Sequence, residues 1–309
     1  MWKYVVKRLL YLIPCIIAVS FIVYFLMGFS GDPALTMAGD TASEAEIEMI
    51  REELGLNRPF LVRYFDYMSG VLRGDFGTNL NGSKDVWTEF TARLPYTIVL
   101  TFAAMLLLIV TSLPLGILAA LKRGSWIDTG LSAISIAALS VPNFWMGLML
   151  ILLFAVKLQW LPVSGAEGWK SIIMPAICAG LSHAALLTRT TRTSMLDSLS
   201  ADFLRTARAK GVPERTVILR HAMGNALIPI ITIVGNQLST IFAGAVAVET
   251  VFTWPGIGYL IVSAIRGNEF NMVTGCVICT TVFVALILLG IDILYAFVDP
   301  RIKARYNGK

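Results

Sequence analysis

The chain has 309 residues, of which 56% are hydrophobic and only 15% are charged, and its formal net charge is +5 at pH 7. Soluble globular domains carry about 25% charged residues, so this composition and the mean hydropathy of +0.73 exclude an ordinary soluble fold. They predict an all-α polytopic membrane protein. We attribute the net positive charge to membrane topology and contact with lipid headgroups, and we expect no nucleic-acid binding.

Six stretches free of Asp, Glu, Lys and Arg predict six transmembrane helices, because a helix needs about 20 apolar residues to cross the hydrocarbon core. The stretches are Leu9–Gly31, Leu94–Leu121, Thr129–Val156, Ser171–Thr188, Ala222–Val248 and Phe270–Ile291. A cleaved signal peptide is the alternative for the first stretch. Its apolar core is longer than the usual run of about 7–15 residues, however, and no small-residue cleavage site follows. We therefore expect a transmembrane helix there.

The distribution of basic residues predicts the orientation, because Lys and Arg near helix ends resist translocation. Segment 189–221 has seven basic and three acidic residues, whereas segment 32–93 has eleven acidic and six basic residues. Other basic residues lie near the chain ends: Lys3, Lys7, Arg8, Arg301, Lys303, Arg305 and Lys309. We expect a multi-pass protein of the plasma (inner) membrane, with both termini and segment 189–221 in the cytoplasm. This topology divides the chain into the N-terminal end with the first span, an external helical insertion and a five-helix core: 1–30, 31–94 and 95–309.

The external insertion has the patterns of short helices. Ser43 and Glu46 form a capping box and Gly55 supplies a stop signal, so one helix is expected between them. A second helix is expected to begin at Pro59. The apolar face predicted for it consists of Leu61, Tyr64, Phe65, Met68, Val71 and Leu72. A further short helix leading into the second span is indicated by Val86, Phe90 and Leu94.

The polar segment 189–221 lies between the fourth and fifth spans and is too charged to lie in lipid. Ser200 can cap a helix of about ten residues, which Gly211 can close in the left-handed conformation. Pro213 is suited to begin the next helix. The cations gather in the last turns, as the helix dipole favours, so an inert surface helix explains part of the pattern. The alternative is a helix onto which another protein docks.

Three motifs follow one another in and after this segment: Thr206–Gly211, Arg220–Ala222 and Asn225–Pro229. Together they resemble the EAA loop of binding-protein-dependent ABC importer permeases, in the form typical of the dipeptide/oligopeptide/nickel permease family. Motifs similar to family positions occur in the same order along nearly the whole chain: Lys7–Leu9, Gly31–Pro33, Leu54–Leu56, Gly74–Gly77, Pro142–Trp145, Trp160–Pro162, Thr193–Leu196, Phe252–Gly258 and Asp299–Arg301. One departure is Arg205-Thr206-Ala207, where the general pattern has Glu-Ala-Ala. The similar peptide and nickel permeases share this substitution.

The resemblance implies a type I ABC importer permease fold with six transmembrane helices, in a transport subunit that is not itself an enzyme. It implies a heterodimer with a homologous second permease, two ATPase subunits and an external solute-binding protein. ATP and Mg are expected on the ATPase subunits, because this chain has no G-x-x-x-x-G-K-[ST] loop, and no cofactor is expected on this chain. The expected solute is a di- or oligopeptide, with nickel or a metal chelate as the alternative. The residues expected to couple the chain to an ATPase are Phe203, Arg205, Thr206, Ala207, Arg208, Lys210 and Gly211.

Several polar or aromatic residues in the predicted spans are candidates for the translocation path. Asn143, Trp145 and Asn236 lie beside helix-breaking Pro or Gly residues, and His183 and Asp292 are ionisable residues inside spans. A single histidine supplies one metal ligand, so a hydrogen-bonded histidine of the bundle is the alternative reading of His183. No metal site is predicted.

Other classes of protein remain as alternatives. The Cys276 and Cys279 pair has C-x-x-C spacing but lies on an apolar span, where thiols act as small hydrophobic groups. A secondary transporter driven by an ion gradient is the alternative transport mechanism, although the two halves of the chain show no internal repeat. A membrane-embedded enzyme has no support from paired acids, H-E-x-x-H or G-x-S-x-G motifs.

Overall fold

The computed structural model describes residues 2–39 and 41–298, which form two compact units. The first unit comprises Met1–Thr97 with Pro255–Leu286, and the second Ile98–Trp254 with Ile287–Lys309. In the described part of the chain, the secondary structure is helical apart from one isolated bridge between Thr78 and Asp85. The motif Asp299–Arg301 and the basic C-terminal residues lie outside the described residues.

The described residues contain five helices that are long and apolar enough to cross a membrane. They are Leu10–Met27, Val86–Leu121, Trp169–Leu199, Glu214–Val251 and Phe270–Leu294. The helix pair Trp126–Ser140 and Asn143–Lys157 is bent by 102° and is either a broken sixth span or a re-entrant loop. The described residues thus contain five to six candidate membrane spans, and the stretch predicted as the third span, Thr129–Val156, is not one continuous helix.

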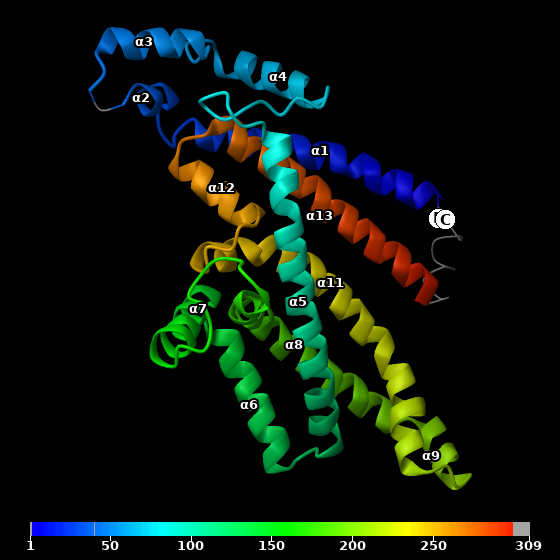
Figure 1. Cartoon of the computed structure of the whole chain (residues 1–309). Coiled ribbons are helices and arrows are strands. Elements are labelled where there is room, and N and C mark those ends of the chain that lie inside the picture. Colours follow the sequence, from blue (N-terminus) through cyan, green and yellow to red (C-terminus); the bar gives the residue numbers. More distant parts are fainter. Residues whose placement is uncertain (1, 40, 299–309) are drawn as a thin grey trace. The chain divides into compact units, whose positions relative to one another are not determined.

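The break in the third span follows from Pro142. Proline has no N–H for the helix and its ring clashes with the carbonyl of the preceding turn, and it also drives the residue before it out of the helical region. Val141 accordingly has extended backbone angles, φ −87° and ψ 123°. Helix α6 ends at Ser140, and α7 begins at Asn143 in a new direction (Figure 1).

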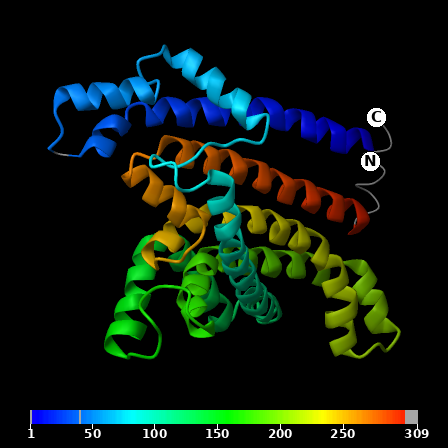
Figure 2. The same cartoon turned by 45° about the horizontal axis from the view of Figure 1, so that its top comes forward.

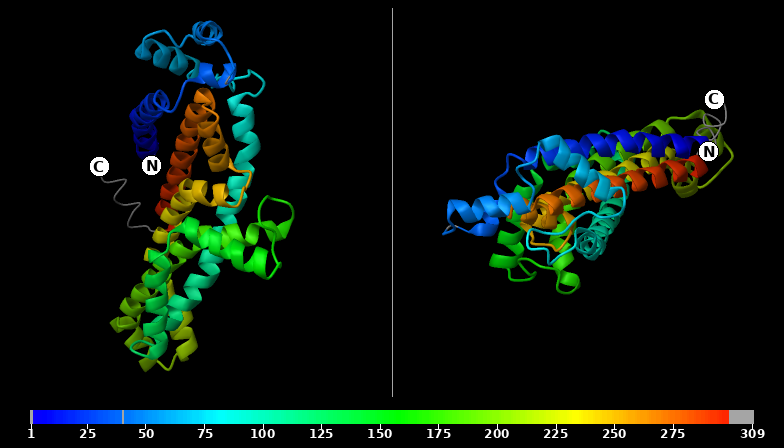
Figure 3. Two further views of the ribbon diagram at one scale, coloured as in Figure 1. Left: turned by 90° about the vertical axis from the view of Figure 1, so that its left-hand side faces the viewer. Right: turned by 90° about the horizontal axis from the view of Figure 1, so that it is seen from above.

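The first unit contains the chain's first helices and the helical insertion that follows the first span. Its elements are α1 (Trp2–Met27), α2 (Pro33–Ala38), α3 (Glu44–Glu53), α4 (Phe60–Val71), the start of α5 (Val86–Leu121), α12 (Ile257–Arg266) and the start of α13 (Phe270–Val298). Helix α1 lies beside the start of α13, and α4 crosses the second half of α1 (Figures 2 and 3). The Ser20 and Tyr64 hydroxyls are 2.9 Å apart at this crossing, and the Phe21 ring packs edge-on against Tyr64.

The capping patterns of the insertion are confirmed. The Ser43 N–H donates to the Glu46 carboxylate at 2.8 Å, while the Ser43 hydroxyl oxygen accepts from the Glu46 N–H. Gly55 has φ +65° and follows Leu54, the C-cap residue of α3. Each of these motifs depends only on residues a few positions apart in the chain, so the sequence alone could predict them.

Two expectations for this unit need correction. The predicted apolar face of α4 is divided: Tyr64 is 4% exposed against α1, whereas Phe65 and Leu72 are 64% and 84% exposed. The crossing with α1 selects the side that carries Phe60, Tyr64 and Tyr67. The short helix predicted at Val86, Phe90 and Leu94 is the first part of the continuous helix α5.

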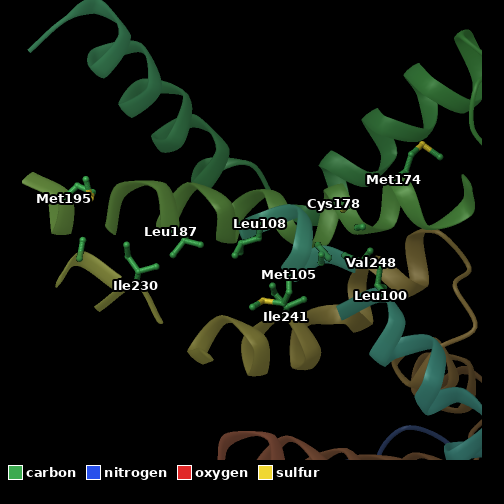
Figure 4. Close-up of a cluster of buried hydrophobic side chains, with 14 of the residues drawn as sticks. Leu100, Met105, Leu108, Met174, Cys178, Leu187, Met195, Ile230, Ile241 and Val248 are labelled. Carbon is green, nitrogen blue, oxygen red and sulfur yellow. The ribbon is translucent and has the colours of Figure 1, made fainter. Parts of the chain in front are cut away.

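The second unit is built around α8. Besides the remainder of α5 and α13, it contains α6 (Trp126–Ser140), α7 (Asn143–Leu150), the π-helical η1 (Ile151–Lys157), η2 (Trp169–Ile172), α8 (Ile173–Leu199), α9 (Asp202–Ala209), α10 (Glu214–Thr216), the π-helical η3 (Val217–Ala222) and α11 (Met223–Val251). In the span that contains α8, 61% of the most apolar 18-residue stretch is buried, compared with 22% in the span that contains α11. Figure 4 shows buried side chains from α5, α8 and α11 meeting, among them Leu108, Leu187 and Ile241.

Candidate functional site

Helix α9 is the element predicted to contact another protein, and its start differs from the expectation. Ser200 has helical backbone angles, φ −83° and ψ −10°, and ends α8 instead of capping α9. Its hydroxyl donates to the Asp197 carbonyl at 2.9 Å. Ala201 takes the N-cap position of α9 without a side-chain bond, and the acidic Asp202 lies in the first turn, where the helix dipole favours a negative charge.

The predicted closure of α9 by Gly211 is confirmed. Gly211 has φ +76°, a conformation that costs a residue with a Cβ atom more than it costs glycine. The Gly211 N–H donates to the Arg208 carbonyl at 2.9 Å, and the Val212 N–H donates to the Ala207 carbonyl at 3.2 Å. These two bonds form a Schellman motif, which fixes where the helix ends and where the chain turns.

One face of α9 is anchored in the core of the second unit. Leu204 is 0% exposed and belongs to the same buried cluster as Val217 of η3, and Ala207 packs against this cluster. Another face is exposed: Phe203 is 45% exposed and the Arg205 side chain is 87% exposed. Thr206 and Lys210 are also exposed. The short helix is therefore held firmly but offers an aromatic ring and cations to solvent.

Arg208 differs from Arg205 because it has a partner within the chain. Its Nε and Nη2 atoms donate to the two Glu214 carboxylate oxygens at 3.1 Å and 2.8 Å. This carboxylate raises the pKa of Arg208, so the guanidinium is charged at every physiological pH. The exposed ion pair links the end of α9 to the start of α10.

A second bidentate ion pair joins α6 to α8. Arg192 donates through Nε and Nη2 to the two oxygens of Asp128 at 2.5 Å and 2.8 Å, and the Gly124 N–H donates to the same carboxylate at 3.0 Å. Asp128 is 7% exposed and Arg192 is 28% exposed. Sequence reasoning did not single out this pair, because the residues are 64 positions apart. The signal available was an isolated acid shortly after the basic Lys122 and Arg123.

Next to this pair, α5 and α8 approach closely. A Cβ atom added to Gly116 would lie 2.6 Å from the Thr191 Cβ and 2.7 Å from the Thr188 carbonyl oxygen. The Ser112 hydroxyl donates to the Ala184 carbonyl at 2.9 Å one turn earlier. Small residues and interhelical hydroxyl bonds are the usual basis of close helix packing in membranes. Helices α5, α6 and α8 are thus held together near the end of α8 that leads to α9.

The predicted translocation-path residues are placed on three helices of the second unit. The Cys178 thiol of α8 donates to the Asn143 carbonyl at 3.0 Å, while the nearby Trp145 side chain is 47% exposed. His183 of α8 contacts the side chain of Gln237 on α11, next to the exposed Asn236. Gln237, which is 5% exposed, was missed, although an amide residue in an apolar run was visible in the sequence.

The other candidate groups do not assemble into a metal site. No group of three or more His, Cys, Asp or Glu side chains that could hold a metal ion occurs among the described residues. Cys276 and Cys279 are free, buried thiols. Asp292 lies partly buried on α13.

Comparisons with known proteins extend over nearly the whole chain. The family model of the binding-protein-dependent transport system inner membrane component matches residues 112–304, and the model of its N-terminal region matches residues 1–101. The glutathione transport system permease protein GsiC of Escherichia coli (strain K12) is 38% identical over 304 residues, which cover 98% of this chain and 99% of that protein. GsiC of Shigella dysenteriae serotype 1 (strain Sd197) shows the same identity and coverage.

A solved structure has a similar fold. The inward-facing MetNI methionine ABC transporter, in its CY5 native crystal form, aligns with a TM-score of 0.57 and 18% identity. The alignment covers 68% of this chain and 96% of that chain. The protein is a multi-pass inner-membrane permease component of an ABC importer, whose ATPase activity resides in separate subunits. By its sequence it belongs to the family of binding-protein-dependent transport system inner membrane components.

Proposed function

We propose that the chain is the permease subunit of an importer for short peptides of the glutathione type. The similarity to GsiC over 98% of the chain carries this proposal. In the proposed complex, a homologous second permease completes the path, two ATPase subunits bind ATP and Mg, and an external binding protein delivers the peptide. Both termini and α9 lie in the cytoplasm. The relatives described above give no support to nickel as the solute.

Helix α9 is proposed as the element that couples transport to the ATPase. The exposed Phe203 ring fits an apolar pocket, and Arg205 and Lys210 fit acidic groups around it. Leu204 is fully buried against the cluster that includes Val217. A displacement of α9 therefore cannot be absorbed locally without breaking this packing.

The connections of α9 give the displacement a direction. Helix α8 ends just before α9, and η3 leads directly into α11. Helices α8 and α11 share the buried core in Figure 4. We infer that closure of the two ATPase subunits moves α9, and that α8 and α11 move with it to open and close the path past His183 and Gln237.

Uptake by a reconstituted complex tests the solute and the energy source. The chain is reconstituted with its partner subunits and binding protein in liposomes, and uptake of radiolabelled glutathione is measured with ATP supplied on the ATPase side. We expect uptake that needs ATP hydrolysis and persists when ionophores collapse the ion gradients. Uptake that stops with the gradient would favour a secondary transporter, and uptake of Ni²⁺ without peptide would favour the metal alternative.

Substitutions on α9 test the coupling role. Phe203→Ala and Arg205→Glu are expected to lower ATP-dependent uptake and copurification of the ATPase at least about 10-fold, the equivalent of 1.4 kcal/mol of lost contact. Arg215→Glu is the matched control, because Arg215 is an exposed cation of α10 outside the predicted contact. Equal copurification by all three variants would remove α9 from the interface.

A further inference from the structure

A cavity of about 250 Å³ lies in the first unit, between the end of α1, the turn from α3 to α4 and the start of α13. Tyr24, Leu56, Arg58, Arg63, Asp66 and Phe270 are among the residues that line it. A neighbouring hollow of about 410 Å³ shares Leu56, Arg63 and Phe270. Arg63 therefore lies in the wall common to both spaces.

Arg63 is the unusual group in this cavity, because it forms no ion pair with a carboxylate of the described residues. Its Nη1 atom donates to the Leu56 carbonyl at 2.9 Å, and the guanidinium interacts with the Tyr24 hydroxyl group. Its Nε atom is buried and has no hydrogen-bond partner. Both bonding partners are neutral, so part of the donor capacity of this guanidinium is left over.

The neighbouring arginines show the usual arrangement. Arg51 is bound by Asp32 through two hydrogen bonds of 2.8 Å and 2.5 Å. The Arg58 Nη1 atom lies 3.4 Å from the Asp66 Oδ2 atom, so these two side chains also form an ion pair. Among the described residues, no carboxylate forms an ion pair with Arg63. The cavity therefore carries one net positive charge, from Arg58 and Arg63 against Asp66, and this charge is centred on Arg63.

We propose that this cavity binds a short peptide by its carboxylate, with Arg63 as the carboxylate-binding residue. A partly buried guanidinium favours a carboxylate because its donors form two parallel, charge-assisted bonds with the two oxygens. Apolar walls from Leu56 and Phe270 suit a small side chain, and Asp66 offers an acceptor to the ammonium group at the other end of a peptide. The single net charge suits one carboxylate better than a doubly charged phosphate.

The inference rests on the proposed function, because it assigns the cargo of the importer to a site on the external side. It adds a binding site on the permease itself, outside the path past His183. The short peptide would contact Arg63 after leaving the binding protein and before entering the membrane part of the complex.

Binding of matched peptide pairs tests the site. The permease is purified with its partner subunits in lipid nanodiscs, without the external binding protein, and peptide binding is measured by equilibrium dialysis. The probes are dialanine and glutathione, each compared with a form lacking free carboxylates, dialanine amide and glutathione diethyl ester. We expect the free acids to bind at least about 10-fold more tightly than the blocked forms, and Arg63→Gln to abolish this difference. Equal binding of acids and blocked forms, or an unchanged difference in Arg63→Gln, would overturn the proposal.

Two variants exclude indirect effects. Arg63→Lys keeps the positive charge but loses the planar guanidinium that can bind both carboxylate oxygens. This variant should fold normally and bind the acids with intermediate affinity. Arg73→Gln, an exposed arginine of the same unit, should bind them as the unaltered protein does. If dialanine binds through Arg63 and glutathione does not, the site stands and the glutathione assignment falls. If neither acid binds while ATP-driven glutathione uptake proceeds, the site falls and the proposed function stands.

Discussion

Two arginine–carboxylate pairs of the second unit have the same forked geometry in different surroundings. Arg192 and Asp128 join α6 to α8 with exposures of 28% and 7%, whereas Arg208 and Glu214 join α9 to α10 with exposures of 42% and 56%. Removing one partner of a buried pair leaves an uncompensated charge, but an exposed pair exchanges its partner for water at little cost. The first pair therefore stabilises the helix packing, whereas in the proposed coupling contact the second pair can exchange Glu214 for a carboxylate of an ATPase subunit.

The largest effect is expected where the buried pair is broken. Asp128→Asn removes the charge that balances Arg192, and we expect it to lower the free energy of unfolding by about 3 kcal/mol, the lower end of the range for buried pairs because Arg192 is partly exposed. Thermal unfolding in detergent measures this change. The double variant Asp128→Asn/Arg192→Gln should recover part of the loss. An unaltered midpoint for Asp128→Asn would show that the pair contributes no more than an exposed one.

The packing beside the buried pair gives the next effect. Gly116→Ala places a methyl group 2.7 Å from the Thr188 backbone carbonyl, which cannot turn aside as a side chain can. We expect a loss of about 2 kcal/mol from overpacking. The matched control is Gly130→Ala in α6, where no atom lies within 4 Å of the added carbon. Equal unfolding midpoints for the two variants would contradict a close contact between α5 and α8.

A smaller loss of stability is expected when Gly211, in the turn that ends α9, is replaced. The φ of +76° disfavours a Cβ atom, although no atom lies within 4 Å of it, so Gly211→Ala should cost about 1 kcal/mol through the backbone alone. Amide hydrogen exchange should show faster opening of α9 while α5 and α8 are unaffected. Gly211→Asn should lose less, because asparagine tolerates this conformation better. Faster exchange throughout the unit would mean that the turn is not a local feature.

The smallest change in stability is expected for the exposed pair. Arg208→Gln should leave the unfolding midpoint of the isolated chain unchanged, since both partners are solvated. It should still reduce copurification of the ATPase, whereas Glu214→Gln, which frees Arg208, should maintain or increase it. A drop in the midpoint as large as that of Asp128→Asn would remove the distinction between the two pairs.

The local features of this chain were determined by the sequence alone. The capping box of Ser43 and Glu46, the left-handed turn at Gly211 and the apolar runs that become membrane helices each depend on groups within one or two helical turns. Hydrogen bonds and burial at such short range are encoded in the order of the residues, so the helical class and the position of α9 could be predicted. The boundary at Ser200 could not, because a serine at a helix junction can end one helix as readily as it caps the next.

Only the tertiary structure decided the features that join distant residues. Pro142 predicts a break, but the angle of 102° depends on how α7 packs against α8. Likewise, the sequence could not show that Arg192 meets Asp128, that Arg208 meets Glu214, or that Arg63 forms no ion pair with a carboxylate in the described part of the chain. The side of α4 that is buried was decided by its crossing with α1. The physical reason is common to all of them: a charge or an apolar face is stabilised by whichever neighbour the fold brings within a few ångströms, and that neighbour is not encoded locally.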